Sequence, residues 1–197
     1  PQKAMEDAAP IGLLPTVVRV WERVRKPLVA AWRATVERDY NWAAKGRSPQ
    51  EAVWKHALID EAAAARGESS AAVLVDLTKA FERGKLELVW RAGLRLHFPP
   101  MLLRLVLESF AFARVLTMGG AVTTEVHTLS AILAGGSFAA DALFIVLAEQ
   151  CDEMLIDYPN AELCLFVDDL TLHVTGTERY VATALPGLLD DCIDRLE

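Results

Sequence analysis

The chain has few cysteines, no long apolar run and, in its second half, few cations. Its three cysteines, Cys151, Cys164 and Cys192, form no CxxC pair, which favours reduced thiols in an intracellular protein over a disulfide framework. The longest apolar stretch, 138–148, is interrupted by Asp141 and is too short to span a bilayer. No signal peptide is recognised at the start of the sequence, so we expect no membrane as a partner.

The sequence also lacks the common phosphate-binding and nucleophile motifs. It contains no Walker loop, no GxGxxG fingerprint and no nucleophile elbow. Its four histidines are scattered, and no spacing of histidine and cysteine indicates zinc. With 53% hydrophobic and 24% charged residues, the composition is that of a globular domain without repeats or low-complexity tracts.

Charge is distributed unevenly along the 197 residues. The first hundred hold 16 Lys or Arg against 12 Asp or Glu, whereas the remainder holds 4 against 15, for a net charge of −7. The negative total argues against a simple nucleic-acid binder. A cationic first half is nevertheless suited to template contacts, and an acidic second half to a metal site.

Helical and strand patterns alternate along the chain. Residues 17–36 repeat apolar positions at spacings of three and four, which predicts an amphipathic helix kinked at Pro27. A capping box at Ser48 starts a second helix, and Gly67 is placed to end it. Further helices are expected over 84–96, 101–112, 137–157 and from 178 onward, with weak strands at 113–118 and 121–127. Few strands among many helices predict an α+β domain.

Two acidic signatures follow strand-like runs. Asp76 closes the run 71–75, and Asp168 and Asp169 follow the run 163–167. The alternating residues 170–174 come next and predict the returning strand of a hairpin. Carboxylates at neighbouring strand ends can bind two divalent cations, which is the arrangement used in phosphoryl transfer.

These signatures resemble motifs of reverse transcriptases of the non-LTR retrotransposon type. Asp76-Leu77-Thr78-Lys79-Ala80-Phe81-Glu82 resembles motif A of that family, usually Asp-Leu-Ser-Lys-Ala-Phe-Asp, and Phe166-Val167-Asp168-Asp169 resembles motif C. Residues 134–137, Ala-Gly-Gly-Ser, stand where motif B usually reads Pro-Gln-Gly-Ser. Residues 9–15 are similar to the family's Arg-Pro-Ile-Ser-Leu-Leu segment, with Ala9 in place of the arginine.

The resemblance implies a polymerase palm: an antiparallel sheet backed by helices. Residues 1–67 would be a partial fingers region and residues 68–197 the palm with motifs A, B and C, in a fragment that lacks the thumb. The activity implied is RNA-directed DNA polymerisation, a nucleotidyl transfer onto a primer.

The resemblance also implies the roles of individual residues. Asp76, Asp168 and Asp169 would be catalytic and would bind Mg²⁺, with Mn²⁺ as an alternative. Phe81 and Gly136 would contact the nucleotide, Phe81 as the steric gate against a 2′-hydroxyl. The partners would be an RNA template with a DNA primer and deoxynucleoside triphosphates, in the nucleus.

Three other interpretations remain open. The chain could be a catalytically decayed retroelement copy that acts at most as a nucleic-acid-binding domain, because Ala9 and the changed motif B depart from the family pattern. It could be another palm-type enzyme such as a nucleotidyl cyclase, although Phe81 favours a reverse transcriptase. It could also be a plain nucleic-acid-binding module.

Overall fold

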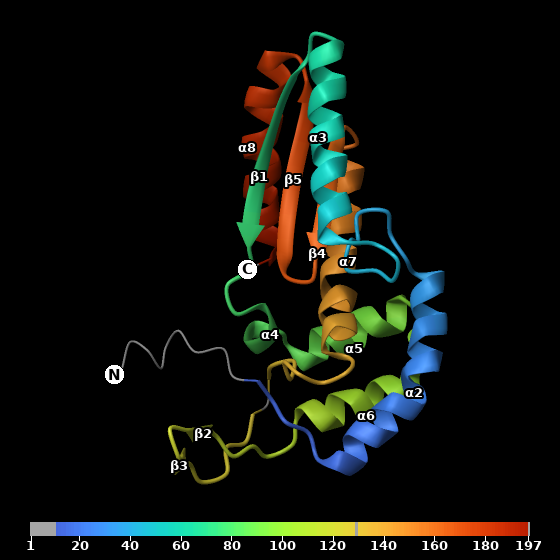
Figure 1. Ribbon diagram of the computed structural model, residues 1–197, viewed down its shortest axis with the longest axis vertical. Coiled ribbons are helices and arrows are strands. Elements are labelled where there is room, and N and C mark those ends of the chain that lie inside the picture. The colour runs from blue at the N-terminus through green and yellow to red at the C-terminus, as the bar shows by residue number, and fades with distance from the viewer. Residues whose placement is uncertain (1–10, 129, 197) are drawn as a thin grey trace. The chain divides into compact units, whose positions relative to one another are not determined.

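The computed structural model describes residues 11–128 and 130–196 and has a mixed α+β fold with an antiparallel sheet (Figure 1). The chain forms two compact units, each built from separated segments. The first unit comprises residues 1–36 and 79–146, and the second comprises 37–78 and 147–197. The contiguous division into 1–67 and 68–197 stays a prediction.

The second unit contains the main sheet. Its three strands are β1 (Ser69–Asp76), β4 (Ala161–Phe166) and β5 (Asp169–Gly176), in the order β1-β5-β4 with both pairs antiparallel. β5 is central, and its alternate residues Leu170, Leu172 and Val174 are buried. The opposite face of the sheet carries the alternate pairs of β5 and β1, which include Asp169 with Asp76, Thr171 with Leu74 and His173 with Ala72.

Two helices of this unit, α3 (Pro49–Ala65) and α8 (Glu178–Leu196), pack on β1 and β5. The expected capping box is confirmed, because the Ser48 hydroxyl accepts a hydrogen bond from the amide of Glu51 while the Glu51 carboxylate accepts one from the amide of Ser48. Gly67, with φ of +71°, ends the helix as expected. α7 (Ala139–Asp157) contributes residues 147–157 to this unit.

The first unit is mainly helical. Its elements are α2 (Thr16–Thr35), α4 (Ala80–Arg83), α5 (Leu86–Arg95), α6 (Pro100–Phe110), the short hairpin β2 (Thr117–Met118) and β3 (Ala121–Val122), and the first turns of α7. α5 and α6 pack closely, since a Cβ at Gly93 would lie 2.7 Å from the Leu103 side chain. Trp32 of α2 packs edge-on against Phe98 and donates a hydrogen bond to the carbonyl of Leu96.

The sequence pattern of α2 predicted its extent but not its buried face. Trp32 is buried as expected, yet Val17, Val24 and Leu28 of the same predicted stripe are 74%, 64% and 52% exposed. The buried positions include Val29 and Glu22 instead. The helix is therefore present over the predicted range, and its core contacts come from a second stripe that includes Val29.

Cys151, Cys164 and Cys192 are all buried and free of disulfides. None of the helices within residues 11–128 and 130–196 has the length and apolar composition needed to span a membrane.

Candidate active site

Two acidic residues lie opposite each other at the open tip of the sheet. Asp76 is the last residue of β1 and Asp169 the first residue of β5, and the two are directly paired in the antiparallel register. Residues opposite each other in this way project from the same face, with Cβ atoms about 4.5–5.5 Å apart. Both side chains are exposed. Like charges placed directly opposite each other destabilise a sheet unless a cation lies between or beside them.

Asp168 occupies the hairpin turn beside this pair. Phe166 pairs with Asp169, so Val167 and Asp168 alone form the loop between β4 and β5. Asp168 is half-buried, and its carbonyl accepts a hydrogen bond of 3.4 Å from the amide of Leu77, directly after Asp76. This hydrogen bond joins the turn to the end of β1, so the three acidic residues lie in one local structure.

The turn has a strained backbone. Val167 has φ of +61°, a left-handed value that a β-branched side chain rarely adopts and that two-residue hairpins usually assign to glycine. Such a conformation costs on the order of 1–3 kcal/mol and tends to occur at functional sites. The packing of β4 and β5 maintains it here.

The oxygen donors at this tip are of the kind that Mg²⁺ prefers. Asp76 and Asp169 supply two carboxylates on one face, which fits the donor chemistry of a divalent cation. Among the described residues, however, no three His, Cys, Asp or Glu side chains gather closely enough to hold a metal ion. The full trio as a metal site stays a prediction.

Phe81 and Gly136 belong to the first unit, where they lie on connected segments. Phe81 is half-buried, and its carbonyl accepts a hydrogen bond of 2.8 Å from the amide of Ile132. The motif B-like segment follows directly: the amide of Gly136 donates to the carbonyl of Leu133 at 3.1 Å. The structure therefore links the Phe81 segment to the motif B-like segment through the main chain.

The glycines of this segment permit close packing within the protein. A Cβ at Gly135 would lie 2.7 Å from the carbonyl oxygen of Gly12, and one at Gly136 would lie 3.3 Å from the Phe110 ring. The amide of Ser137 donates to the buried carboxylate of Glu22 at 3.3 Å. The amides of Gly136 and Ser137 thus have protein acceptors, and the nucleotide-binding role of Gly136 stays a prediction.

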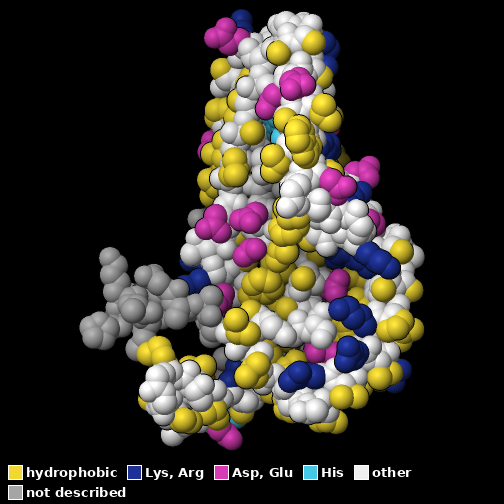
Figure 2. Space-filling model, in the orientation of Figure 1, with side chains coloured by type: hydrophobic (Ala, Val, Ile, Leu, Met, Phe, Trp, Pro, Cys, Tyr) yellow, Lys and Arg dark blue, Asp and Glu magenta, His cyan; other side chains and the backbone are white. Residues whose placement is uncertain are grey.

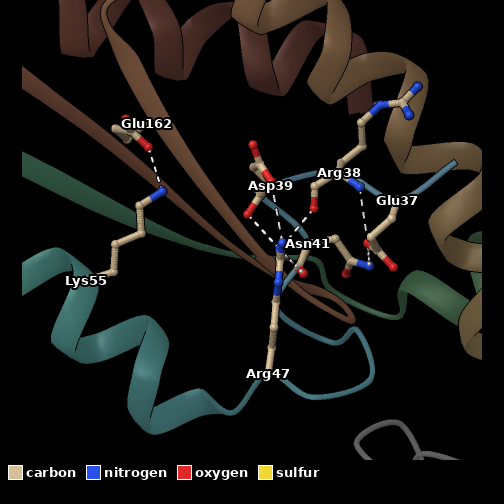
Figure 3. A network of polar contacts seen from close by, with 7 residues as sticks. All are labelled: Glu37, Arg38, Asp39, Asn41, Arg47, Lys55 and Glu162. Atoms are coloured by element: carbon tan, nitrogen blue, oxygen red, sulfur yellow. Dashed lines mark hydrogen bonds and ion pairs between the residues drawn. The ribbon is translucent and has the colours of Figure 1, made fainter. Parts of the chain in front are cut away.

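Arg47, in the loop before α3, has a structural role. Its guanidinium donates hydrogen bonds to the carbonyls of Arg38, Asp39 and Asn41 at 2.8–3.0 Å (Figure 3). It also lies 5.4 Å from the ring centroid of Trp42. Arg47 therefore holds the loop that precedes α3.

A polar cluster that the sequence did not indicate lies between α3 and β5. His173 is 1% exposed; its Nδ1 is 2.9 Å from Nδ1 of His56, and its Nε2 is 2.6 Å from the hydroxyl of Ser70 and 3.1 Å from a carboxylate oxygen of Asp60. Burial and the neighbouring His173 lower the pKa of His56, while the hydrogen bond from Ser70 lowers the pKa of Asp60. The only sequence signal was a histidine within the predicted strand that follows Asp168 and Asp169.

Comparison with known proteins identifies the fold but not the family. No protein-family model and no curated protein sequence matches the chain. A solved structure of telomerase from Candida albicans, in complex with a TWJ fragment of telomeric RNA, matches with a TM-score of 0.54 at 11% identity. The fold is similar to part of telomerase. The match covers 88% of this chain and 32% of the telomerase chain, so this chain spans about a third of its neighbour's length.

At this identity the likeness concerns the fold alone. Ala9, where the family pattern has an arginine, lies outside the described residues.

Proposed function

We propose that this chain is the palm and partial fingers of an RNA-directed DNA polymerase of the non-LTR retrotransposon type. The observation that carries the proposal is the in-register pairing of Asp76 with Asp169 beside the Asp168 turn. The sequence motifs resemble those of reverse transcriptases at these same positions, and the fold is similar to that of telomerase. The RNA fragment in the telomerase structure supports a nucleic-acid substrate.

The residues at the sheet tip have defined roles in this proposal. Asp76 and Asp168, with Asp169 beside them, would hold Mg²⁺, with Mn²⁺ as an alternative. Divalent ions bound there would stabilise the charge on the attacking and leaving oxygens of nucleotidyl transfer. The open face around Asp76, where Leu74 is 81% exposed, leaves room for the primer end. Phe81 would exclude a ribose 2′-hydroxyl.

A decayed retroelement copy is the alternative that a specific observation favours. The Ser137 amide, at the start of the motif B-like turn, is bonded to Glu22, whose carboxylate would repel a phosphate. In that case the chain would at most bind nucleic acid.

Primer extension on an RNA template distinguishes an active polymerase from a decayed retroelement copy. Asp76→Asn and Asp168→Asn should each lower extension by at least about a hundredfold, since each removes a charge that stabilises the transition state. Asp190→Asn, on α8, is the matched control and should leave extension unchanged. The proposal fails if the unaltered protein, shown to be folded, does not extend a primer with Mg²⁺ or Mn²⁺, or if Asp76→Asn extends as well as the control.

A further inference from the structure

Helix α2 presents an apolar seam to solvent on the side away from its core contacts. Val17, Val20, Val24 and Leu28 are 74%, 56%, 64% and 52% exposed. Their spacing of three, four and four residues places them along one stripe of the helix, and Ala31, also exposed, continues it. A stripe of four aliphatic side chains is the kind of surface through which two helices pack against each other.

The seam has a cationic edge that pairs with no described acidic residue. Arg19 and Arg23 are exposed on the side of the stripe next to Val20, and neither forms an ion pair with a described residue; Arg25, also exposed, flanks the other side of the stripe. The only acidic residue of α2, Glu22, is 1% exposed and faces the interior of its unit. By contrast, Arg91 of α5 and Arg104 of α6 are each paired with a glutamate one turn away. Figure 2 shows Lys and Arg side chains gathered over the part of the molecule that holds α2, α5 and α6.

We infer that the α2 seam, defined as Val17, Val20, Val24 and Leu28 with its edge of Arg19 and Arg23, is a docking surface for an amphipathic helix of a protein partner. That helix carries apolar residues at heptad spacing and Asp or Glu along the flank that meets the cationic edge. The apolar seam supplies the buried area, and the charges select the partner and its orientation.

Charge complementarity distinguishes this occupant from others. A second copy that docked α2 against α2 would bring two cationic edges together, which opposes a symmetric dimer through this helix. Nucleic acid would use the cations but would leave four exposed aliphatic side chains in water. An acidic-edged helix is the occupant that satisfies both features.

The test uses two synthetic 21-residue peptides as probes. Both carry leucine at heptad positions a and d; one has glutamate at the flanking e and g positions, and the other has lysine there. Like charges keep each peptide from associating with itself. Binding of labelled peptide to the full chain is measured by fluorescence anisotropy at low and moderate salt. The glutamate peptide should bind at least about tenfold more tightly than the lysine peptide, with salt weakening the difference.

Variants locate the contact. Val20→Glu with Val24→Glu should weaken binding of the glutamate peptide by more than about tenfold, because charges replace the seam and repel the probe. Arg19→Glu with Arg23→Glu should reverse the preference toward the lysine peptide. Leu58→Glu with Trp54→Glu, on the exposed side of α3, is the control and should bind the glutamate peptide as before.

Three outcomes would overturn the inference. One is that the peptides bind equally or not at all. Another is that the seam variant, shown to be folded by circular dichroism, binds the glutamate peptide normally. The third is that an RNA duplex or anionic phosphatidylserine vesicles bind the chain and compete with the glutamate peptide. If the seam variant and the Arg19→Glu with Arg23→Glu variant also no longer bind that ligand, the surface belongs to it.

Discussion

At the scale of single residues, the tip of the sheet combines a strained backbone with opposed charges. Val167 adopts φ of +61° in the turn that carries Asp168, and Asp76 faces Asp169 across the strands. Neither feature stabilises the fold by itself. Both features are explained if this end of the sheet binds a ligand, because strand pairing alone requires neither of them.

Replacing Val167 with glycine should stabilise the protein. The left-handed conformation of a β-branched residue costs on the order of 1–3 kcal/mol, and glycine returns about 0.5–1 kcal/mol of that through its greater freedom in the unfolded chain. We expect a gain of up to about 2 kcal/mol in the free energy of unfolding, measured by urea denaturation. Val73→Gly, in the interior of β1, should destabilise. A Val167→Gly protein less stable than the unaltered chain would show that the turn is not strained.

Phe81 is the residue whose role can be tested most directly through substrate selection. Its ring is half-buried, which is compatible with both a core residue and a gate. If the chain has the proposed polymerase activity and Phe81 is its gate, Phe81→Ala should raise incorporation of ribonucleotides relative to deoxynucleotides, because removal of the ring removes a clash. Competitive primer extension with the two nucleotides measures the ratio. An unchanged ratio would make Phe81 a packing residue.

At the scale of elements, α3 is joined to the sheet by the histidine pair. The two Nδ1 atoms of His56 and His173, 2.9 Å apart, can share only one proton, and Nε2 of His173 is occupied by Ser70 and Asp60. Nε2 of His56 is buried without a described partner.

This contact predicts a pH dependence of stability. The pKa of His56 is lowered by burial, by His173 and by Lys55, so the unfolded chain binds more protons than the folded one once the pH falls below the ordinary histidine pKa of about 6.5. Stability should be full above that value and decline as the pH falls toward 5. The lowered pKa of Asp60, which Ser70 and His173 cause, acts only at lower pH.

Thermal unfolding between pH 5 and 8 measures the effect. His56→Leu should flatten the dependence, because it removes the shared proton. His97→Asn is the matched control: it removes a histidine elsewhere and keeps a residue that tolerates the positive φ of 56° at that position. If His56→Leu and the unaltered chain lose stability in parallel below pH 6.5, the pair is not responsible.

The elements themselves were largely predictable, whereas their contacts were not. The capping box at Ser48, the strand ending at Asp76 and the hairpin at Asp168 each carry a local signal, and each is confirmed. The buried face of α2 was missed because apolar spacing does not say which of two apolar stripes meets the core. The His56–His173 contact joins residues 117 positions apart, and no local pattern encodes such a pairing.

At the scale of the whole molecule, the two units differ in charge. By sequence, the first unit holds 13 Lys or Arg against 8 Asp or Glu, and the second holds 7 against 19. The paired acids at the sheet tip therefore lie in the strongly acidic unit. A polyanionic substrate would approach this unit only against a repulsive field unless cations were bound.

This charge distribution predicts that the 197-residue chain alone binds RNA–DNA hybrid weakly and extends a primer only a few nucleotides. The net charge of −7 opposes a polyanion, and the cationic unit supplies few phosphate contacts. Ala9 adds to this, because the resemblance to reverse transcriptases implies that the arginine it replaces holds the triphosphate. A missing charge-assisted contact commonly costs about 1.5–3 kcal/mol, so Ala9→Arg should tighten nucleotide binding by about one to two orders of magnitude. The measurement is a titration of labelled hybrid at two salt concentrations, followed by Mg²⁺ and nucleotides. Weak binding that Mg²⁺ strengthens, with short products, is expected. Tight binding without Mg²⁺ and long products would mean that the acidic unit does not repel the substrate and that its charge is screened by other means.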